Sequence, residues 1–222
     1  MPFGDPFVLR SIIAGTEVTL VGTLGSGTVA LLAAFIAGLA RLSPRRAIRL
    51  AATLYVEVFR GASTVVLLFW AFYVLPGVGT NLTPLALGIV VLGLNSGAYA
   101  SEIVRGAVMD VPRGQWEAAS ALHMSSIRRM WTVVLPQAVP TMIPSFGNVL
   151  IDILKGTALF SLITVTDLTF AVNQLTVIGA AELVPAYTFL LLMYFVLSLP
   201  LMALVRLASR TVAQPAALPA IG

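Results

Sequence analysis

Residues 114–140 read GQWEAASALHMSSIRRMWTVVLPQAVP and place Glu117, His123, Arg128 and Arg129 between two long apolar runs. In the whole chain of 222 residues, 59% are hydrophobic, 10% are charged, and the mean hydropathy is +0.99. A soluble domain has about 25% charged residues, so this chain has too few polar side chains to coat a soluble core. The composition indicates a polytopic membrane protein in which the polar part of this segment lies outside the bilayer.

Five apolar runs are long enough to cross a bilayer, which takes about 20 residues of helix. They cover residues 18–40, 53–76, 84–109, 132–163 and 184–207. The fourth contains Pro136, Pro140 and Pro144, and we expect it to begin at the interface and to kink, because each proline removes a backbone donor. The sequence therefore predicts an all-α fold, with a single transmembrane domain over 1–210 and a disordered cytoplasmic tail over 211–222.

The arginines set the expected orientation. Four lie in the first connection, three in the third, and two at or after the end of the last run: Arg41, Arg45, Arg46 and Arg49; Arg113, Arg128 and Arg129; Arg206 and Arg210. The second and fourth connections carry no Lys or Arg. The positive-inside rule then puts the first and third connections and the C-terminus in the cytoplasm, with the N-terminus outside. Residues 7–17 look amphipathic and are expected to lie on the outer surface.

The connection over 110–131 is longer than two antiparallel helices need, since such connections usually take about 2–8 residues. Its WEAASALHM segment reads as a short helix, on which Trp116, Ala119 and Leu122 form a narrow apolar face. Two interpretations follow from these residues. The segment is either an amphipathic helix resting on the bilayer surface or a docking element for a soluble partner.

The run EAASALHMSSIRRMWTVVLP is similar to the signature of permeases of binding-protein-dependent ABC importers, which is Glu-Ala-Ala, three residues, Gly, nine residues, Ile-x-Leu-Pro. Its matching residues are Glu117, Ala118, Ala119, Leu135 and Pro136, with Val133 in place of the Ile. The segments YVEVFRG (55–61), LNSGAYASEIVRGAV (94–108), PRGQWEAA (112–119), LPQAVPTMIPSFGN (135–148) and ILKGT (153–157) resemble the polar amino-acid branch, which includes histidine and glutamine permeases. The FWAFYVLP run resembles permeases for ectoine-like compatible solutes.

This resemblance implies a type I ABC importer-like fold with five transmembrane helices and a cytoplasmic coupling helix that docks on an ATPase. The implied partners are two ATPase subunits, a second permease (the same chain or a paralogue), an extracytoplasmic solute-binding protein and the lipid bilayer of the bacterial cytoplasmic membrane, and no nucleic acid. ATP and Mg²⁺ are expected on the ATPase and no cofactor on this chain. The implied coupling residues are Arg113, Glu117, Ala118, Ala119, Leu122, His123 and Met124.

Two coupling residues leave alternatives open. Glu117 is either a carboxylate favoured by the helix dipole or a partner for a cation across the interface. His123 stands where the signature has glycine, and this position is either a turn with positive φ, which His tolerates better than most residues, or a ligand or pH sensor.

The chain departs from the resemblance in two membrane segments. Where relatives read Arg-Gly-Thr-Pro followed by Leu-Leu-Val-Gln, it has Arg60, Gly61, Ala62 and Ser63 followed by TVVL (64–67). Where they read Lys-Asp-Thr-Ser, it has Lys155, Gly156, Thr157 and Ala158. The Gln of the first segment and the Asp and Ser of the second are therefore polar groups that this chain lacks in the membrane. The resemblance therefore does not fix the solute.

Ionisable residues inside a bilayer are costly, so each is a functional candidate. Glu57 with Arg60, and Glu102 with Arg105, are three apart and can pair across one helical turn, so both are predicted to be structural ion pairs. Asn148, Asp152 and Lys155 share one face of the fourth run. Asp152 and Lys155 either neutralise each other or offer one charge of each sign to a zwitterion. With Asn95 and Thr157 they form the predicted substrate pathway.

Other functions find less support in the sequence. A P-loop needs Gly-Lys followed by Ser or Thr, and the only lysine, Lys155, is followed by glycine. An intramembrane enzyme needs a nucleophile with a base or closely spaced metal ligands, but there is one His, no Cys, and no two carboxylates within a helical turn, so no metal site is expected. A secondary transporter of a small polar solute is the alternative, although five spans lack the paired halves usual in such folds.

Overall fold

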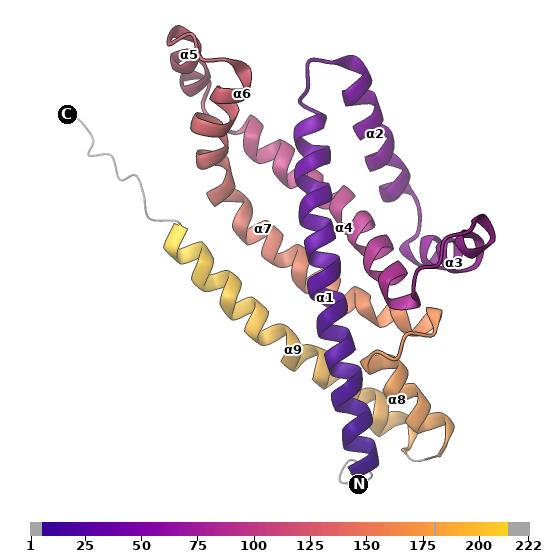
Figure 1. Cartoon of the computed structure of the whole chain (residues 1–222). Helices are drawn as coiled ribbons and strands as arrows, with labels where there is room; N and C mark the ends of the chain where they lie inside the picture. The colour runs from indigo at the N-terminus through magenta and orange to yellow at the C-terminus, as the bar shows by residue number, and fades with distance from the viewer. Residues whose placement is uncertain (1–5, 180, 213–222) are drawn as a thin grey trace.

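The computed structural model describes residues 6–179 and 181–212, and in these ranges every regular element is helical (Figure 1). The all-α prediction is confirmed. By length and composition, four described helical segments could cross a membrane: Pro6–Ala40, Pro84–Met109, Ser126–Ile163 and Leu183–Ser209. The bent pair Arg46–Gly61 and Thr64–Val78 gives a fifth if it is one span.

The centre of the fold is the contact between α1 (Pro6–Ala40) and α4 (Pro84–Met109). A Cβ atom added at Gly93 would come within 2.5 Å of Cβ of Val29, and one at Gly97 within 2.7 Å of Cβ of Ala33. The two backbones therefore approach as closely as small residues allow, which is the usual way that helices associate in a bilayer. This close pair holds α4 and its polar residues in the middle of the molecule.

The expected surface helix over residues 7–17 is wrong, because these residues continue α1 without a break. Val8 and Ile12 are buried, with 3% and 5% of their surface exposed, against α8 (Leu168–Val177) and α9 (Leu183–Val212). One side of this segment thus packs against protein, while Leu9 and Ile13 on its other side are 51% and 50% exposed.

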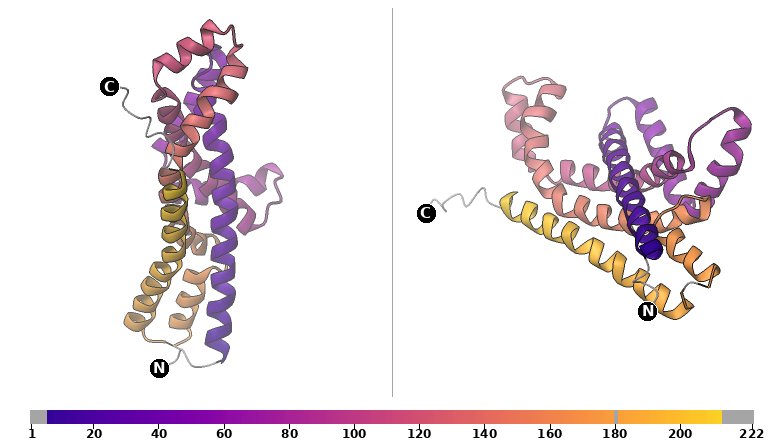
Figure 2. Two further views of the ribbon diagram at one scale, coloured as in Figure 1. Left: turned by 90° about the vertical axis from the view of Figure 1, so that its left-hand side faces the viewer. Right: turned by 60° about the horizontal axis from the view of Figure 1, so that its bottom comes forward.

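The predicted span over 53–76 is not a single straight helix. The chain forms α2 (Arg46–Gly61) and α3 (Thr64–Val74), whose axes differ by 102°, followed by a 3₁₀ turn over Leu75–Val78. Ala62 and Ser63 between them are extended, with ψ of 142° and 130°. The right-hand view of Figure 2 shows α3 turning away from the direction of α2.

The fourth run changes helix type where a kink was expected. Short helix α6 (Ser126–Arg129) continues through a π-helical turn, η3 (Met130–Val134), into α7 (Leu135–Gly156) and then a 3₁₀ turn, η4 (Thr157–Ile163). Pro136 is the second residue of α7, and the π turn precedes it directly, so its missing N–H falls where the helix changes its hydrogen-bond register. Pro140 and Pro144 lie inside α7. The segment over 126–163 therefore stays helical throughout.

The two arginine-rich connections lie at the same end of the molecule. In Figure 1 the α1–α2 connection and the short helices α5 (Arg113–Ala121) and α6 are at the top, while the described start of α1 and helix α8 are at the bottom. Of the tail predicted over 211–222, residues 211 and 212 extend α9, and the remainder lies outside the described residues.

Candidate functional site

Helices α5 and α6 form a hairpin over residues 113–129 that turns at His123. His123 has a φ of 54°, as the turn interpretation predicts. Its backbone N–H donates to the Ser120 carbonyl at 2.9 Å, and the N–H of Met124 donates to that of Ala119 at 3.1 Å. These bonds satisfy carbonyls that the end of α5 would otherwise leave unpaired. The left-handed residue therefore closes the first helix and reverses the chain.

The hairpin is braced internally by a contact that the sequence analysis missed. The guanidinium of Arg129 lies 5.3 Å from the centre of the Trp116 ring, and its Nη1 donates to Ser120 Oγ at 2.6 Å. At the base of the hairpin, Gln137 of α7 donates to Gln115 at 3.3 Å. The spacing of Trp116 and Arg129 carries no helical signal, since they lie on different helices. Together these contacts make the hairpin a unit joined to α7.

The outer surface of the hairpin carries most of the predicted coupling residues. Arg113, Glu117, Ala118, Leu122 and His123 are exposed, Met124 is half-buried, and Ala119 is 3% exposed and faces inward. Leu122 and Ile127 are 76% and 75% exposed, so the surface is partly apolar. The carboxylate of Glu117 makes no ion pair or hydrogen bond with the described residues. This surface has the apolar and charged groups that a protein interface uses.

Glu102 is the centre of a second polar cluster, where α1 ends beside α2 and α4. Its carboxylate accepts from Arg41 Nη1, from Arg105 Nε at 2.8 Å and from Arg60 Nη1 at 3.4 Å. The structure thus contains the predicted pair of Glu102 with Arg105. The predicted pair of Glu57 with Arg60 is wrong for the described chain, because Arg60 reaches across to α4 instead. Arg41 is 61 residues from Glu102, so spacing could not reveal it.

Asp152 lies where two hollows meet. A cavity of about 260 Å³ is lined by Thr64, Asn95, Ser96, Tyr99, Asp152 and Gly156, among others. A neighbouring one of about 450 Å³ is lined by residues of α7 and α9: Asn148, Ile151, Asp152, Lys155, Met202, Val205 and Arg206. Lys155 Nζ lies 3.8 Å from Asp152 Oδ1, and both side chains are exposed, by 61% and 77%. This region therefore offers one carboxylate and two cations to an open space.

Two residues of the predicted pathway have other surroundings. Asn95 lines the smaller cavity but is only 5% exposed, and its amide donates to the Phe59 carbonyl at 2.7 Å and accepts from Thr64 Oγ1 at 2.9 Å. Thr157 is fully buried and donates to the Leu154 carbonyl at 2.7 Å. Asn95 therefore braces the α2–α3 break, and Thr157 lines neither cavity that Asp152 lines.

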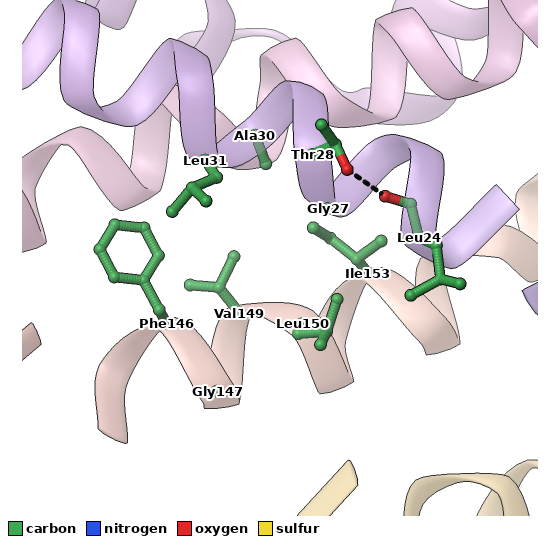
Figure 3. Close-up of a pocket in the computed structure, with 10 residues that line it drawn as sticks. All are labelled: Leu24, Gly27, Thr28, Ala30, Leu31, Phe146, Gly147, Val149, Leu150 and Ile153. Atoms are coloured by element: carbon green, nitrogen blue, oxygen red, sulfur yellow. Dashed lines mark hydrogen bonds between the residues drawn. The ribbon is translucent and has the colours of Figure 1, made fainter. Parts of the chain in front are cut away.

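A further cavity, of about 320 Å³, lies between α1 and α7 (Figure 3). Its side chains are apolar except for Thr28, whose hydroxyl donates to the Leu24 carbonyl one turn earlier on the same helix at 2.8 Å. No charged side chain lines this cavity. It therefore lacks the groups that a zwitterionic solute needs.

Comparison with known proteins shows the family to which this chain belongs. The profile of the family described as binding-protein-dependent transport system inner membrane component matches residues 7–214. The chain belongs to this family. It is 43% identical over 206 residues to the probable amino-acid ABC transporter permease protein y4tF of Sinorhizobium fredii, covering 90% of this chain and 86% of that one. The L-cystine transport system permease protein TcyB of Bacillus subtilis is 38% identical over 154 residues, which cover 69% of this chain and 66% of TcyB.

Solved structures of ABC transporters have the same fold as this chain. The crystal structure of an amino acid ABC transporter with histidines superimposes with a TM-score of 0.83 at 32% identity, covering 91% of this chain and 94% of the other. The MetNI methionine ABC transporter, in inward-facing conformations, shares the fold with a TM-score of 0.79 at 21% identity. The type I ABC importer-like fold and the predicted family are confirmed. As a family member, the chain is a multi-pass component of the inner membrane.

Proposed function

We propose that this chain is the permease subunit of an ATP-driven importer that moves a small zwitterionic solute of the amino-acid class. An extracytoplasmic binding protein delivers the solute, and a second permease, the same chain or a paralogue, completes the pathway. Two ATPase subunits bind ATP and Mg²⁺ and dock on the α5–α6 hairpins. The N-terminus lies outside and the C-terminus in the cytoplasm, as the arginine distribution predicts.

The observation that carries this proposal is the exposed α5–α6 hairpin. Glu117 and Leu122 are exposed on it, and Glu117 has no ion pair or hydrogen bond with the described residues. Arg129, over the Trp116 ring, ties α5 to α6. Because α6 continues through η3 into α7, a displacement of the hairpin is transmitted along one continuous helical segment to Asp152. ATPase closure can therefore move the lining of the solute pathway.

The cavities around Asp152 support the solute class. A carboxylate at Asp152 complements an ammonium group, while Lys155 and Arg206 complement a carboxylate. Amino acids and ectoine-like compatible solutes both carry one charge of each sign, so the geometry supports the class. The two relatives with amino-acid names favour an amino acid within it.

The test is uptake by proteoliposomes that contain the chain with its ATPase. We expect accumulation of a labelled polar amino acid only when ATP is present on the ATPase side and the binding protein on the other. The chain alone should neither bind nor hydrolyse ATP. Uptake by the chain alone, driven by a proton or sodium gradient, would instead establish the alternative, a secondary transporter.

A further inference from the structure

The cluster around Glu102 has more positive charge than its carboxylate can neutralise. Three guanidinium groups, of Arg41, Arg60 and Arg105, surround this one carboxylate. Glu57, one turn before Arg60 on α2, makes no ion pair with it in the described chain. The cluster therefore carries an excess of two positive charges. Arg45, just before α2, and Arg46 and Arg49, in its first turn, add exposed positive charge nearby.

The guanidinium groups also have unused hydrogen-bond donors. Each guanidinium has five N–H donors, and Glu102 accepts from a single nitrogen of each arginine. Arg105 further donates to Met109 Sδ at 2.9 Å, and Arg60 lies over the Tyr99 ring at 5.5 Å. Arg60 and Arg105 are 40% and 35% exposed, whereas Arg41 is 15% exposed. Two partly exposed arginine side chains thus lie beside a third that is mostly covered.

With the orientation of the proposed function, the cluster lies near the cytoplasmic end of α4, at the level expected for lipid headgroups. Glu102 and Arg105 come seven and four residues before Met109, which ends α4, so they lie about 10 and 6 Å from that end at 1.5 Å per residue. Beyond Arg60 and the α2–α3 break, Val66, Trp70 and Tyr73 on α3 are 62%, 54% and 70% exposed and form an apolar stripe. A lipid molecule that places its phosphate at the arginines therefore has exposed apolar surface on α3 for its chains.

We propose that Arg60 and Arg105 bind the phosphate of an anionic phospholipid in the cytoplasmic leaflet. Arg41 and Glu102 position the two guanidinium forks. Guanidinium groups match phosphate oxygens in paired geometry, and basic pockets between helices on this side of a membrane attract anionic headgroups. The bound lipid would bridge α2 and α4 next to the α2–α3 break. The choice of leaflet rests on the orientation in the proposed function, whereas the phosphate site itself does not.

The experiment uses the complete transporter in bilayers of phosphatidylcholine, alone or mixed with phosphatidylglycerol. We expect native mass spectrometry to find retained phosphatidylglycerol, and the thermal midpoint to rise when it is present. Arg60→Gln with Arg105→Gln should reduce retention about 30-fold, or about fivefold per arginine. Arg10 is an exposed arginine near the other end of α1. Arg10→Gln removes one positive charge far from the cluster and should not change retention.

The outcomes decide between lipid phosphate and its alternatives. Equal retention by the double variant and the wild type would overturn the site. Inorganic phosphate added to pure phosphatidylcholine bilayers should not raise the midpoint; if it does so as fully as phosphatidylglycerol, the site binds soluble phosphate and the lipid assignment is wrong. If the double variant does not assemble, Arg60→Lys tests the same point, because it keeps the charge but loses the paired donors, and should lower retention. Retention unchanged in Arg60→Lys would likewise count against the site.

Discussion

At the scale of single residues, Glu117 is the residue whose surroundings most constrain its role. It is the fifth residue of α5, which has no acidic residue in its first turn. The helix dipole acts within about the first turn, so it stabilises Glu117 little. An exposed carboxylate without a partner in the described chain then fits the second interpretation, a cation on the ATPase.

Replacing Glu117 should therefore impair coupling rather than folding. Glu117→Gln removes one member of a charge pair that docking buries, which costs about 2–5 kcal/mol, and Glu117→Lys adds repulsion. We expect both variants to insert normally but to lose the ATPase during co-purification or to hydrolyse ATP without uptake. Wild-type coupling in Glu117→Lys would show that the hairpin is a surface helix.

His123→Gly should leave activity unchanged. His123 occupies a left-handed conformation that glycine adopts at no steric cost. Uptake, and the thermal stability of the complex, should therefore match the wild type. A loss of uptake with stability retained would mean that the imidazole itself acts, as a ligand or a pH sensor.

Asp152 and Lys155 can be tested as a pair. Their exposed contact at 3.8 Å contributes about 0–1 kcal/mol to stability, so a lost transport activity cannot be attributed to unfolding. If they bind the solute, Asp152→Asn and Lys155→Met should each abolish uptake while the ATPase stays bound, and the double variant should be equally inactive. Recovery of uptake in the double variant would assign the pair a structural role. Full uptake in both single variants would exclude both the solute-binding role and the structural role.

At the scale of elements, the α2–α3 break depends on side chains of α4. The carbonyls of Phe59 and Arg60 lie at the end of α2, and they accept from the Asn95 amide at 2.7 Å and the Tyr99 hydroxyl at 3.0 Å. Thr64, at the start of α3, donates to the same amide. Buried polar groups of this kind need partners in a bilayer, because no water replaces them.

Asn95→Leu should therefore destabilise the protein. It leaves the Phe59 carbonyl and the Thr64 hydroxyl unpaired in a buried site, at a cost of about 1–3 kcal/mol. Denaturant or thermal unfolding of the purified permease in detergent measures this loss. Ser96→Ala is the matched control, because the neighbouring Ser96 lines the same cavity but makes no side-chain hydrogen bond in the described chain. An equal loss in both variants would mean that cavity lining, and not the break, matters.

The elements also show what the sequence could predict. Hydropathy indicated the helical membrane fold and nearly all of α4 and α9, because a long apolar run has few other solutions. It could not show the 102° bend within residues 53–76, because the summed hydropathy of a segment does not depend on the direction of its helix axis. Nor could it show that Val8 and Ile12 pack inside the protein, or that Arg41 meets Glu102, because those contacts join distant segments.

In the candidate site too, local features could be predicted from the sequence and contacts between distant segments could not. The signature motif located the hairpin, and the glycine position occupied by His123 predicted its turn, since both are local features. Asp152 and Lys155 share a helix face, so their approach was predictable. The contribution of Arg206 came only from the packing of α9 on α7, which no spacing within one helix encodes.

At the scale of the whole molecule, the proposed function requires the arginine-rich end to meet an ATPase. The α5–α6 hairpin and the α1–α2 connection lie at that end (Figure 1). Helix α7 begins beyond the hairpin and carries Asp152, which lines both cavities. In this proposal, the permease transmits movement of the ATPase to the solute pathway around Asp152. In the proposed mechanism, docking of the ATPase at the hairpin precedes every movement of the pathway.

Thiol labelling of the hairpin tests this claim most directly, because the natural chain has no cysteine. Leu122→Cys places one thiol at the exposed tip of the hairpin, and Leu82→Cys places a control in the connection before α4, where the leucine is 52% exposed. Both are labelled with a maleimide in detergent, with and without the ATPase subunits. We predict that the ATPase slows labelling of Leu122→Cys by about tenfold or more, as burial in an interface requires, and leaves Leu82→Cys unchanged. Equal labelling of Leu122→Cys in the free permease and in the assembled transporter would contradict the account.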